Sequence, residues 1–291
     1  MNIAILNASG CLDALVAPAV ASTLDAFVTK TVTPLPREGN VPPRIAETEH
    51  GMLNSIGLQN PGIDVFLSDH VPRLAALGIP VWVSVGGFQA QDFAHACSLL
   101  DGSDTVAAIE LNLSCPNVEE APEASAELVQ AARAATGKPL YAKLSPAAWD
   151  VAESARAVAD AGADGLSLVN TIRGLALEPK TLRPVLGRGA GGYSGPALKP
   201  IALACVYACA NAVELPIVGM GGVASGRDAL DLVAAGASAV ALGTILFSDP
   251  GAPTRVRREL DAEVVVRGYE SPAEIRAVAY GVTASATSSP D

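Results

Sequence analysis

The sequence predicts a (β/α)8 barrel, an α/β fold in which eight parallel strands alternate with helices around a closed sheet. Short β-branched or apolar runs alternate with longer Ala/Leu/Val segments of helical period. Eight such units within 291 residues match a TIM barrel better than a doubly wound sheet. Polar and glycine residues follow each run, where this fold builds its active site.

The strands are expected to be short, and their predicted ranges in chain order are 3–6, 26–29, 81–85, 106–111, 140–144, 165–169, 217–220 and 239–242. Helices are predicted over residues 90–100, 123–136, 151–161, 199–213 and 226–235. Several of them end near Gly or Asn, as helices often do. Asp150 is the predicted cap of the third helix and Gly162 its end.

The strand ends carry the residues with chemistry, in the segments 7–10, 30–31, 84–87, 112–115, 143–146, 170–171, 219–222 and 243–244. Two connections, 31–61 and 170–196, are longer than usual, and we expect them to be functional loops covering the barrel mouth. No linker or charge block divides the chain. We therefore expect one domain over residues 1–282 and a disordered tail over 283–291.

Composition excludes several classes of function. A formal net charge of −11 argues against a nucleic-acid or anionic membrane surface. No apolar window of about 18 residues and no signal peptide is found, which predicts a cytoplasmic protein. The five cysteines form no CxxC pair and no Cys/His spacing, so no metal site is expected. None of the three histidines ends a strand, so none is assigned to catalysis.

Glycine turns after the last two strands predict a phosphate site. Gly221 and Gly222, with Ser225 and Gly226 opening a helix, offer backbone N–H groups to an anion, and Gly243 and Thr244 add a second turn. Barrels commonly bind phosphate at these two strands. Tight-turn geometry alone is the alternative explanation.

Two lysines end the second and fifth strands. Lys30 and Lys143 are expected to point over the mouth, where a lysine is costly unless it meets an anion. That anion could be a ligand carboxylate or a reduced flavin ring. Alternatively, either side chain extends to water.

Neutral amides gather in the same region. Asn54, Asn112, Asn117 and Asn170 can both donate and accept, which suits a ring of alternating N–H and C=O groups such as a pyrimidine. The alternative for each is an ordinary turn residue.

The thiol of Cys115 lies in the loop after the fourth strand, within ELNLSCPN. A free thiol can act as a general base when a neighbouring charge helps it to ionise. Nucleophilic attack is a second possibility, although no histidine stands nearby in the motif. A buried structural thiol is the third.

A family resemblance rests on motifs that occur in order between about residues 7 and 280: REGNVPPRIAETEHGMLNSIGLQNPG, ELNLSCPNV, AKLSP, LVNT, GGYSGPALKPIAL, PIVGMGGV and ASAVALGT. With these motifs the chain resembles class 1 dihydroorotate dehydrogenases, flavin enzymes that oxidise dihydroorotate to orotate in pyrimidine synthesis. The resemblance implies FMN as the cofactor.

The resemblance also implies roles for individual residues. Cys115 matches the catalytic base. The substrate set matches Lys30, Asn54, Gly57, Leu58, Asn112, Asn117, Asn170 and Thr171. The FMN set matches Ser9, Lys30, Thr31, Ser84, Asn112, Lys143, Val169, Gly195, Gly221, Gly222, Gly243 and Thr244. Ser84 stands where the family often has Asn, so it keeps a hydrogen-bonding group with a shorter reach.

SIGLQNPG and GGYSGPALKP resemble class 1B in particular. That class implies a homodimer, or a heterotetramer with a subunit that carries FAD and an iron–sulfur cluster and passes electrons to NAD. Fumarate as acceptor remains open. Two alternatives also remain: an FMN barrel of the dihydropyrimidine dehydrogenase type acting on uracil or thymine, and a non-catalytic FMN-binding subunit.

Overall fold

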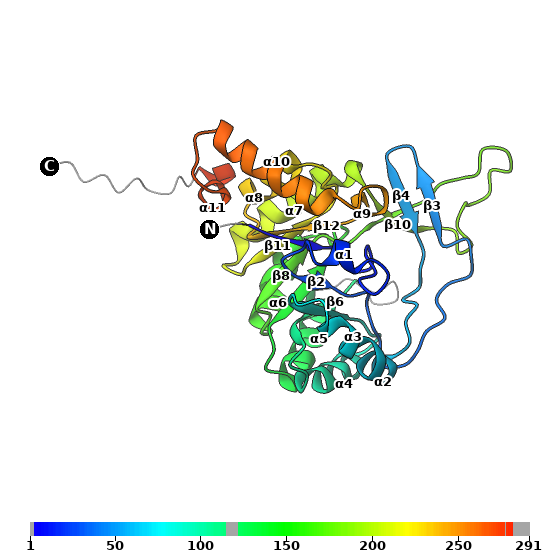
Figure 1. The fold of residues 1–291 in the computed structure, drawn as a ribbon. Coiled ribbons are helices and arrows are strands. Elements are labelled where there is room, and N and C mark those ends of the chain that lie inside the picture. Colours follow the sequence, from blue (N-terminus) through cyan, green and yellow to red (C-terminus); the bar gives the residue numbers. More distant parts are fainter. Residues whose placement is uncertain (1–2, 115–121, 277, 282–291) are drawn as a thin grey trace.

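The computed structural model describes residues 3–114, 122–276 and 278–281, and eight of its strands form one parallel barrel sheet ringed by helices (Figure 1). The strands are β1 (Ala4–Asn7), β2 (Phe27–Val28), β5 (Val81–Val85), β6 (Val106–Asn112), β7 (Leu140–Leu144), β8 (Gly165–Leu168), β11 (Ile217–Met220) and β12 (Ala239–Leu242). Their order is β1-β12-β11-β8-β7-β6-β5-β2. The predicted fold class is confirmed, and each strand lies within one residue of its predicted bounds.

Helices cover the outside of the barrel. The longer ones are α4 (Ala90–Asp101), α5 (Pro122–Ala135), α6 (Val151–Asp160), α7 (Lys199–Ala212), α8 (Gly226–Ala234) and α10 (Ala252–Val266). The shorter ones are α1 (Pro18–Ala21), α2 (Ile63–Val65), the π-helix η1 (Phe66–His70), α3 (Val71–Ala75), the 3-10 helix η2 (Pro196–Leu198), α9 (Ile245–Ser248), α11 (Pro272–Ile275) and the 3-10 helix η3 (Val278–Tyr280). Asp150 caps α6 as predicted, because its carboxylate accepts from the N–H groups of Ala152 and Glu153. Within the described residues, no helix is both long and apolar enough to cross a membrane.

The strands alternate between two cores. On β6, Ile109 and Leu111 face the helices and belong to the large outer core. Glu110 and Asn112 alternate with them and face the barrel axis. A smaller core inside the barrel contains Leu6, Ala26, Val28, Val218, Met220 and Ala241. The barrel is therefore filled by side chains, and its chemistry is confined to one end.

A side chain helps to close the sheet between β1 and β2. The two strands share one isolated parallel bridge, between Leu6 and Ala26. Beyond it, Asn7 Oδ1 accepts from the N–H of Val28 at 2.8 Å, and Asn7 Nδ2 donates to the C=O of Val28 at 2.7 Å. Asn7 is 0% exposed. Its side-chain amide thus takes the place of a backbone peptide group at the seam, the contact between β1 and β2 that closes the barrel sheet.

The two long connections contain an arm that the sequence analysis did not predict. Their strands β3 (Ile45–Thr48), β4 (Gly51–Asn54), β9 (Ile172–Gly174) and β10 (Gly191–Ser194) form an antiparallel sheet in the order β3-β4-β10-β9. This sheet projects from the barrel (Figure 1). The two connections were expected to be loops, and the structure adds strands within them that pair with one another through β4 and β10.

Removing the amide at position 7 should weaken the seam. In Asn7→Ala, the N–H and C=O of Val28 lose their partners in a buried place, so we expect a loss of about 2–5 kcal/mol in the free energy of unfolding. Urea unfolding followed by circular dichroism measures it. The control is Asn211→Ala on the exposed end of α7, which should change stability by about 0.5 kcal/mol or less. Equal stability of the two variants would show that the seam does not depend on Asn7.

Candidate active site

A chain of hydrogen bonds joins the carboxyl ends of several barrel strands. The hydroxyl groups of Thr31 and Ser84 lie 2.9 Å apart. Asn112 Nδ2 donates to Thr31 Oγ1 at 3.2 Å, and Asn170 Nδ2 donates to Asn112 Oδ1 at 3.1 Å. Ser9 Oγ lies 3.5 Å from Thr31 Oγ1. The sequence analysis placed each of these residues at the end of a different strand, and the structure brings all five into one cluster: Ser9, Thr31, Ser84, Asn112 and Asn170.

The members of this cluster lie at different depths. Ser84 is 0% exposed, and its N–H donates to Thr29 Oγ1 at 3.1 Å. Its hydroxyl group therefore lies behind Thr31 and holds that residue in place. Asn112 and Asn170 are half-buried, so part of each side chain faces the mouth.

The base of the arm brings Asn54 and Thr171 together. Asn54 Nδ2 donates to the C=O of Gly192 at 3.3 Å. A Cβ atom on Gly192 would overlap Thr171 Oγ1 and would lie 3.5 Å from Asn54 Nδ2. The N–H of Thr171 donates to Asn170 Oδ1 at 2.8 Å, which links this pair to the cluster at the mouth.

Gly57 and Leu58 lie in the segment that returns from the arm to the barrel. Both have positive φ, +75° and +56° respectively. A side chain at position 57 would lie 2.5 Å from Asn40 Oδ1, so glycine is required there. A Cβ on Gly86 would meet Thr31 Cγ2 at 2.8 Å and Leu58 Cδ1 at 3.8 Å. Leu58 therefore reaches the rim of the mouth beside Thr31.

The predicted phosphate turns lie after the neighbouring strands β11 and β12. Gly221 and Gly222 have φ of +120° and +75°, and Cβ atoms there would lie 2.8 Å from Ala202 Cβ and 2.7 Å from Lys199 Cβ. Among the described residues, the N–H groups of Gly221, Gly222, Gly243 and Thr244 have no hydrogen-bond acceptor. Free N–H groups in adjacent turns form an anion site.

Val169 and Gly195 were also predicted as cofactor contacts, and the structure places Val169 beside the turn after β11 and Gly195 against β4. Val169 Cγ2 would lie 3.4 Å from a Cβ on Gly221, so the two residues are packed together. Gly195 has φ of +127°, and a side chain on it would come within 2.6 Å of Gly51 Cα.

The start of α8 does not contribute to this anion site in the predicted way. The N–H of Gly226 donates to Glu259 Oε2 at 2.8 Å, and the N–H of Ala224 donates to Asp228 Oδ2 at 3.0 Å. Ser225 Oγ accepts from the N–H of Asp228. Ser225 opens α8 as its N-cap, as predicted. The expectation of a free N–H group at Gly226 was wrong, because the carboxylate of Glu259 already binds it.

The two lysines have different surroundings. Lys143 is 5% exposed, and its Nζ lies 3.4 Å from Oε1 of Glu110, which is 1% exposed. The sequence analysis missed Glu110. It precedes Asn112 by two residues on a strand, so the alternation of strand faces was the signal that could have found it.

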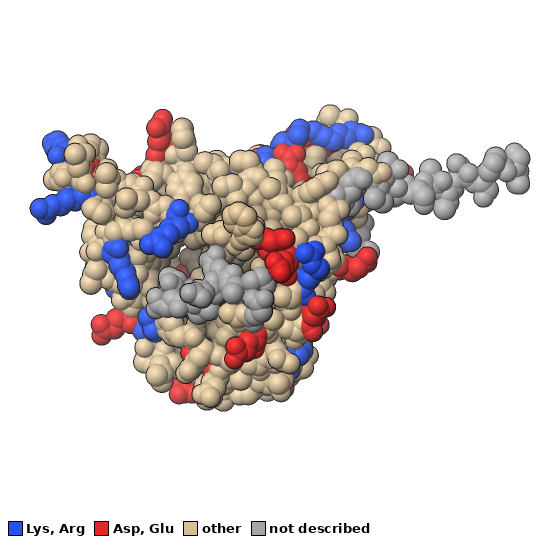
Figure 2. Space-filling model, turned by 180° about the vertical axis from the view of Figure 1, so that it is seen from behind, with Lys and Arg blue, Asp and Glu red and all other residues tan. Residues whose placement is uncertain are grey.

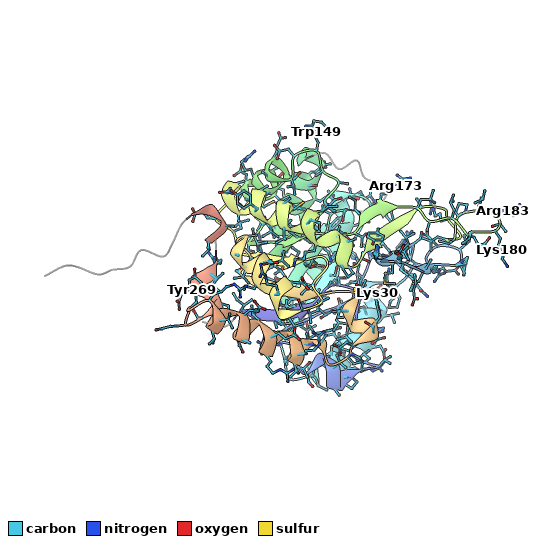
Figure 3. All side chains as sticks on the ribbon, turned by 90° about the horizontal axis from the view of Figure 1, so that it is seen from above. Lys30, Trp149, Arg173, Lys180, Arg183 and Tyr269 are labelled. Carbon is cyan, nitrogen blue, oxygen red and sulfur yellow. The ribbon has the colours of Figure 1, made fainter. Side chains whose placement is uncertain are left out.

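Lys30 lies on the exposed rim, where the barrel meets the arm (Figure 3). Figure 2 shows a hollow in the molecular surface with basic side chains beside it. Partial removal from water lowers the pKa of Lys30, and nearby Arg44 lowers it further, against an opposing effect of Cys11. The carboxylates that bind Lys143 and Lys199 have no counterpart at Lys30 within the described residues.

A cavity of about 410 Å³ opens beside Lys30 and was not predicted; its lining includes Cys11, Lys30, Thr31, Phe66, His70 and Phe247. Burial raises the pKa of the Cys11 thiol, Lys143 and Lys30 lower it, and Glu110 raises it. Cys11 thus lies within the field of the charged groups at the mouth. The predicted residues Cys115 and Asn117 lie outside the described residues.

Comparison with known proteins identifies the family of the chain. The sequence model of the family described as dihydroorotate dehydrogenase matches residues 2–264. The chain therefore belongs to the dihydroorotate dehydrogenase family. The resemblance predicted from the motifs is confirmed.

Curated relatives share the name "Dihydroorotate dehydrogenase B (NAD(+)), catalytic subunit". The protein from Citrifermentans bemidjiense is 45% identical over 255 residues, covering 85% of this chain and 84% of the relative. That from Anoxybacillus flavithermus is 42% identical over 260 residues, covering 87% and 83%. The crystal structure of DHODH from Eimeria tenella in complex with ferulenol has a TM-score of 0.80 at 22% identity, covering 95% of this chain and 85% of that one. That last likeness supports the fold.

The lowered pKa of Lys30 predicts unusual reactivity. At a pH between the lowered value and the ordinary one, more of Lys30 is the neutral amine, which is the nucleophilic form. Trinitrobenzenesulfonate at pH 8 should therefore label Lys30 several times faster than Lys180, at the tip of the arm (Figure 3). Peptide mapping by mass spectrometry measures both rates. Equal rates, or faster labelling of Lys180, would contradict the prediction.

Proposed function

We propose that this protein oxidises dihydroorotate to orotate in pyrimidine biosynthesis, using bound FMN. The observation that carries the proposal is the cluster of Asn54, Asn112, Asn170 and Thr171 facing the mouth beside Lys30. A pyrimidine ring needs alternating donors and acceptors, and a carboxylate substituent needs a cation. The names of relatives at 42–45% identity support the same reaction.

The described residues fit FMN. The free N–H groups of Gly221, Gly222, Gly243 and Thr244 suit its phosphate. Across the mouth, Lys143 offers a buried cation, which suits a ring that becomes negative on reduction. We assign the remaining contacts to Ser9, Lys30, Thr31, Asn112, Val169 and Gly195, with Ser84 supporting Thr31 from behind.

FMN, when bound, supplies the two-electron acceptor for the hydride that leaves C6 of the substrate. The protein's own groups position the substrate. Lys30 pairs with its carboxylate, while Asn54, Asn112, Asn170 and Thr171 bond the ring, and Gly57 and Leu58 form the rim. A bound carboxylate would also raise the pKa of Lys30, because a charged partner favours the ammonium form.

The proton at C5 needs a base, and we assign that role to Cys115, with Asn117 as a further amide contact. Both assignments rest on the sequence, since these residues are outside the described part of the chain. A thiolate can take a proton directly, because its conjugate acid titrates not far above neutral pH.

We also propose a cytoplasmic homodimer that joins a second subunit carrying FAD and an iron–sulfur cluster, through which electrons pass to NAD. The relatives are named as catalytic subunits of NAD(+) enzymes, which supports such a partner. Affinity purification from the native host tests it. An FAD and iron–sulfur protein should elute with this chain, whereas elution alone with turnover on fumarate would contradict the NAD assignment.

Substrate identity can be read from the flavin colour. Under anaerobic conditions, dihydroorotate should bleach the bound flavin within the time of stopped-flow mixing, whereas dihydrouracil, which lacks a carboxylate for Lys30, should not. Yellow protein that neither compound reduces would contradict the oxidation of dihydroorotate. Reduction by dihydrouracil alone would move the protein to the dihydropyrimidine dehydrogenase type.

Replacement of the proposed base tests the mechanism. In Cys115→Ser, flavin reduction by dihydroorotate near neutral pH should slow by about 10²–10⁴-fold, because a hydroxyl group is a far weaker base. FMN content should not change. The matched control is Cys205→Ser, which replaces a buried thiol on α7 away from the mouth. In this variant the flavin should be reduced by dihydroorotate at the wild-type rate. An unaffected rate in Cys115→Ser would mean that another residue is the base.

A further inference from the structure

The buried pair Glu110–Lys143 carries an inference beyond the proposed assignments. We infer that Glu110 is a positioning residue that holds Lys143 in place at the proposed flavin site and partly offsets its charge, and so tunes the reduction potential of FMN when it is bound. The inference rests on the proposed FMN site. It does not depend on the identity of the substrate.

The strand register places the two charges at different depths. Asn112 is the register partner of Lys143, and Glu110 is that of Tyr141, one step deeper in the barrel. Glu110 Oε1 lies 3.4 Å from Lys143 Nζ. Lys143 is therefore rooted nearer to the mouth than Glu110, which suits a pair whose lysine faces the ligand side.

The ammonium group of Lys143 also has N–H donors that are not used within the described residues. A lysine has three N–H donors, and within the described residues Lys143 has one hydrogen-bond acceptor, Glu110. Ser167, its register partner on β8, has a buried hydroxyl group with no partner among the described residues. Polar groups left free in a place as buried as this are suited to a ligand that arrives from the mouth.

The electrostatic effect of the pair extends to Cys11. At Cys11, on the loop after β1, Lys143 lowers the thiol pKa more strongly than Glu110 raises it. At this position the effect of the ammonium exceeds that of the carboxylate, which opposes it. Burial raises the pKa of Tyr141, the register partner of Glu110, and this keeps the phenol neutral.

The effect on the cofactor follows from charge balance. When oxidised FMN takes up two electrons and one proton, the ring gains one negative charge, which a nearby cation stabilises. Glu110 weakens that stabilisation while it keeps the cation in place. Loss of the carboxylate charge alone should therefore favour the reduced form, and loss of Lys143 should disfavour it.

The test is a pair of variants that separate charge from shape. Glu110→Gln keeps the size of the side chain and removes its charge, whereas Glu110→Asp keeps the charge and shortens the side chain. Purified holoenzyme is titrated with dithionite against a redox dye, without substrate. At a fixed dye potential, Glu110→Gln should raise the ratio of reduced to oxidised flavin about tenfold, or about 30 mV for a two-electron couple. Glu110→Asp should stay near wild type.

Several outcomes would overturn the inference. An unchanged or lowered ratio in Glu110→Gln, or equal shifts in both variants, would show that the carboxylate charge does not set the potential. If Glu110→Gln cannot be isolated with FMN, infrared difference spectra of the wild-type protein decide. Reduction should perturb an ionised carboxylate band that is displaced in Glu110→Asp. The absence of that band, or a new protonated carboxyl band, would reject a fixed charge at position 110.

The same experiment distinguishes this inference from the proposed function. A wild-type protein that binds no FMN would remove the basis of both. If FMN binds and Glu110→Gln shifts the titration while dihydroorotate fails to reduce the flavin, the role of Glu110 stands and the substrate assignment falls.

Discussion

The amide of Asn7 is the interaction on which the mouth of the barrel depends. β1 and β2 are short, and one isolated bridge joins them, so the backbone alone gives this part of the sheet few hydrogen bonds. The side chain of Asn7 supplies both a donor and an acceptor to Val28. Because Ser9, Lys30 and Thr31 come shortly after these two strands, the positions of these three residues depend on whether the gap between β1 and β2 is closed.

Charge is distributed in a way that the net value of −11 conceals. Lys30 lies at the rim without a carboxylate partner among the described residues, and in the pair formed by Lys143 and Glu110 the lysine is rooted nearer to the mouth. The free N–H groups after β11 and β12 add partial positive charge. An acidic protein thus has a locally positive mouth. Anionic ligands are attracted to this mouth more than to the rest of the surface.

The sequence was sufficient where burial decides structure. The eight barrel strands are apolar and covered by helices, so composition and spacing located them to within one residue. The arm escaped prediction because its strands are partly exposed, contain several glycines, and pair across segments such as Asn54 and Gly192. Glu110 was missed because its partner lies on the next strand. The error at Gly226 arose because Glu259, on α10, reaches the start of α8, a contact that no local pattern indicates.

The residues assigned to FMN and those assigned to the substrate lie in parts of the fold that are held in place differently. The turns assigned to FMN follow strands within the closed sheet, which helices cover on the outside. Asn54 and Thr171, assigned to the substrate, lie where the arm joins the barrel and are tied to each other through Gly192. A shift of the arm would therefore move these two together, and the hydrogen bonds from Thr171 to Asn170 and from Asn170 to Asn112 would carry it to the amide cluster. Lys143 and Glu110 lie on adjacent strands of the closed sheet and are bonded to each other, so the arm can change the substrate contacts while this buried pair stays in place.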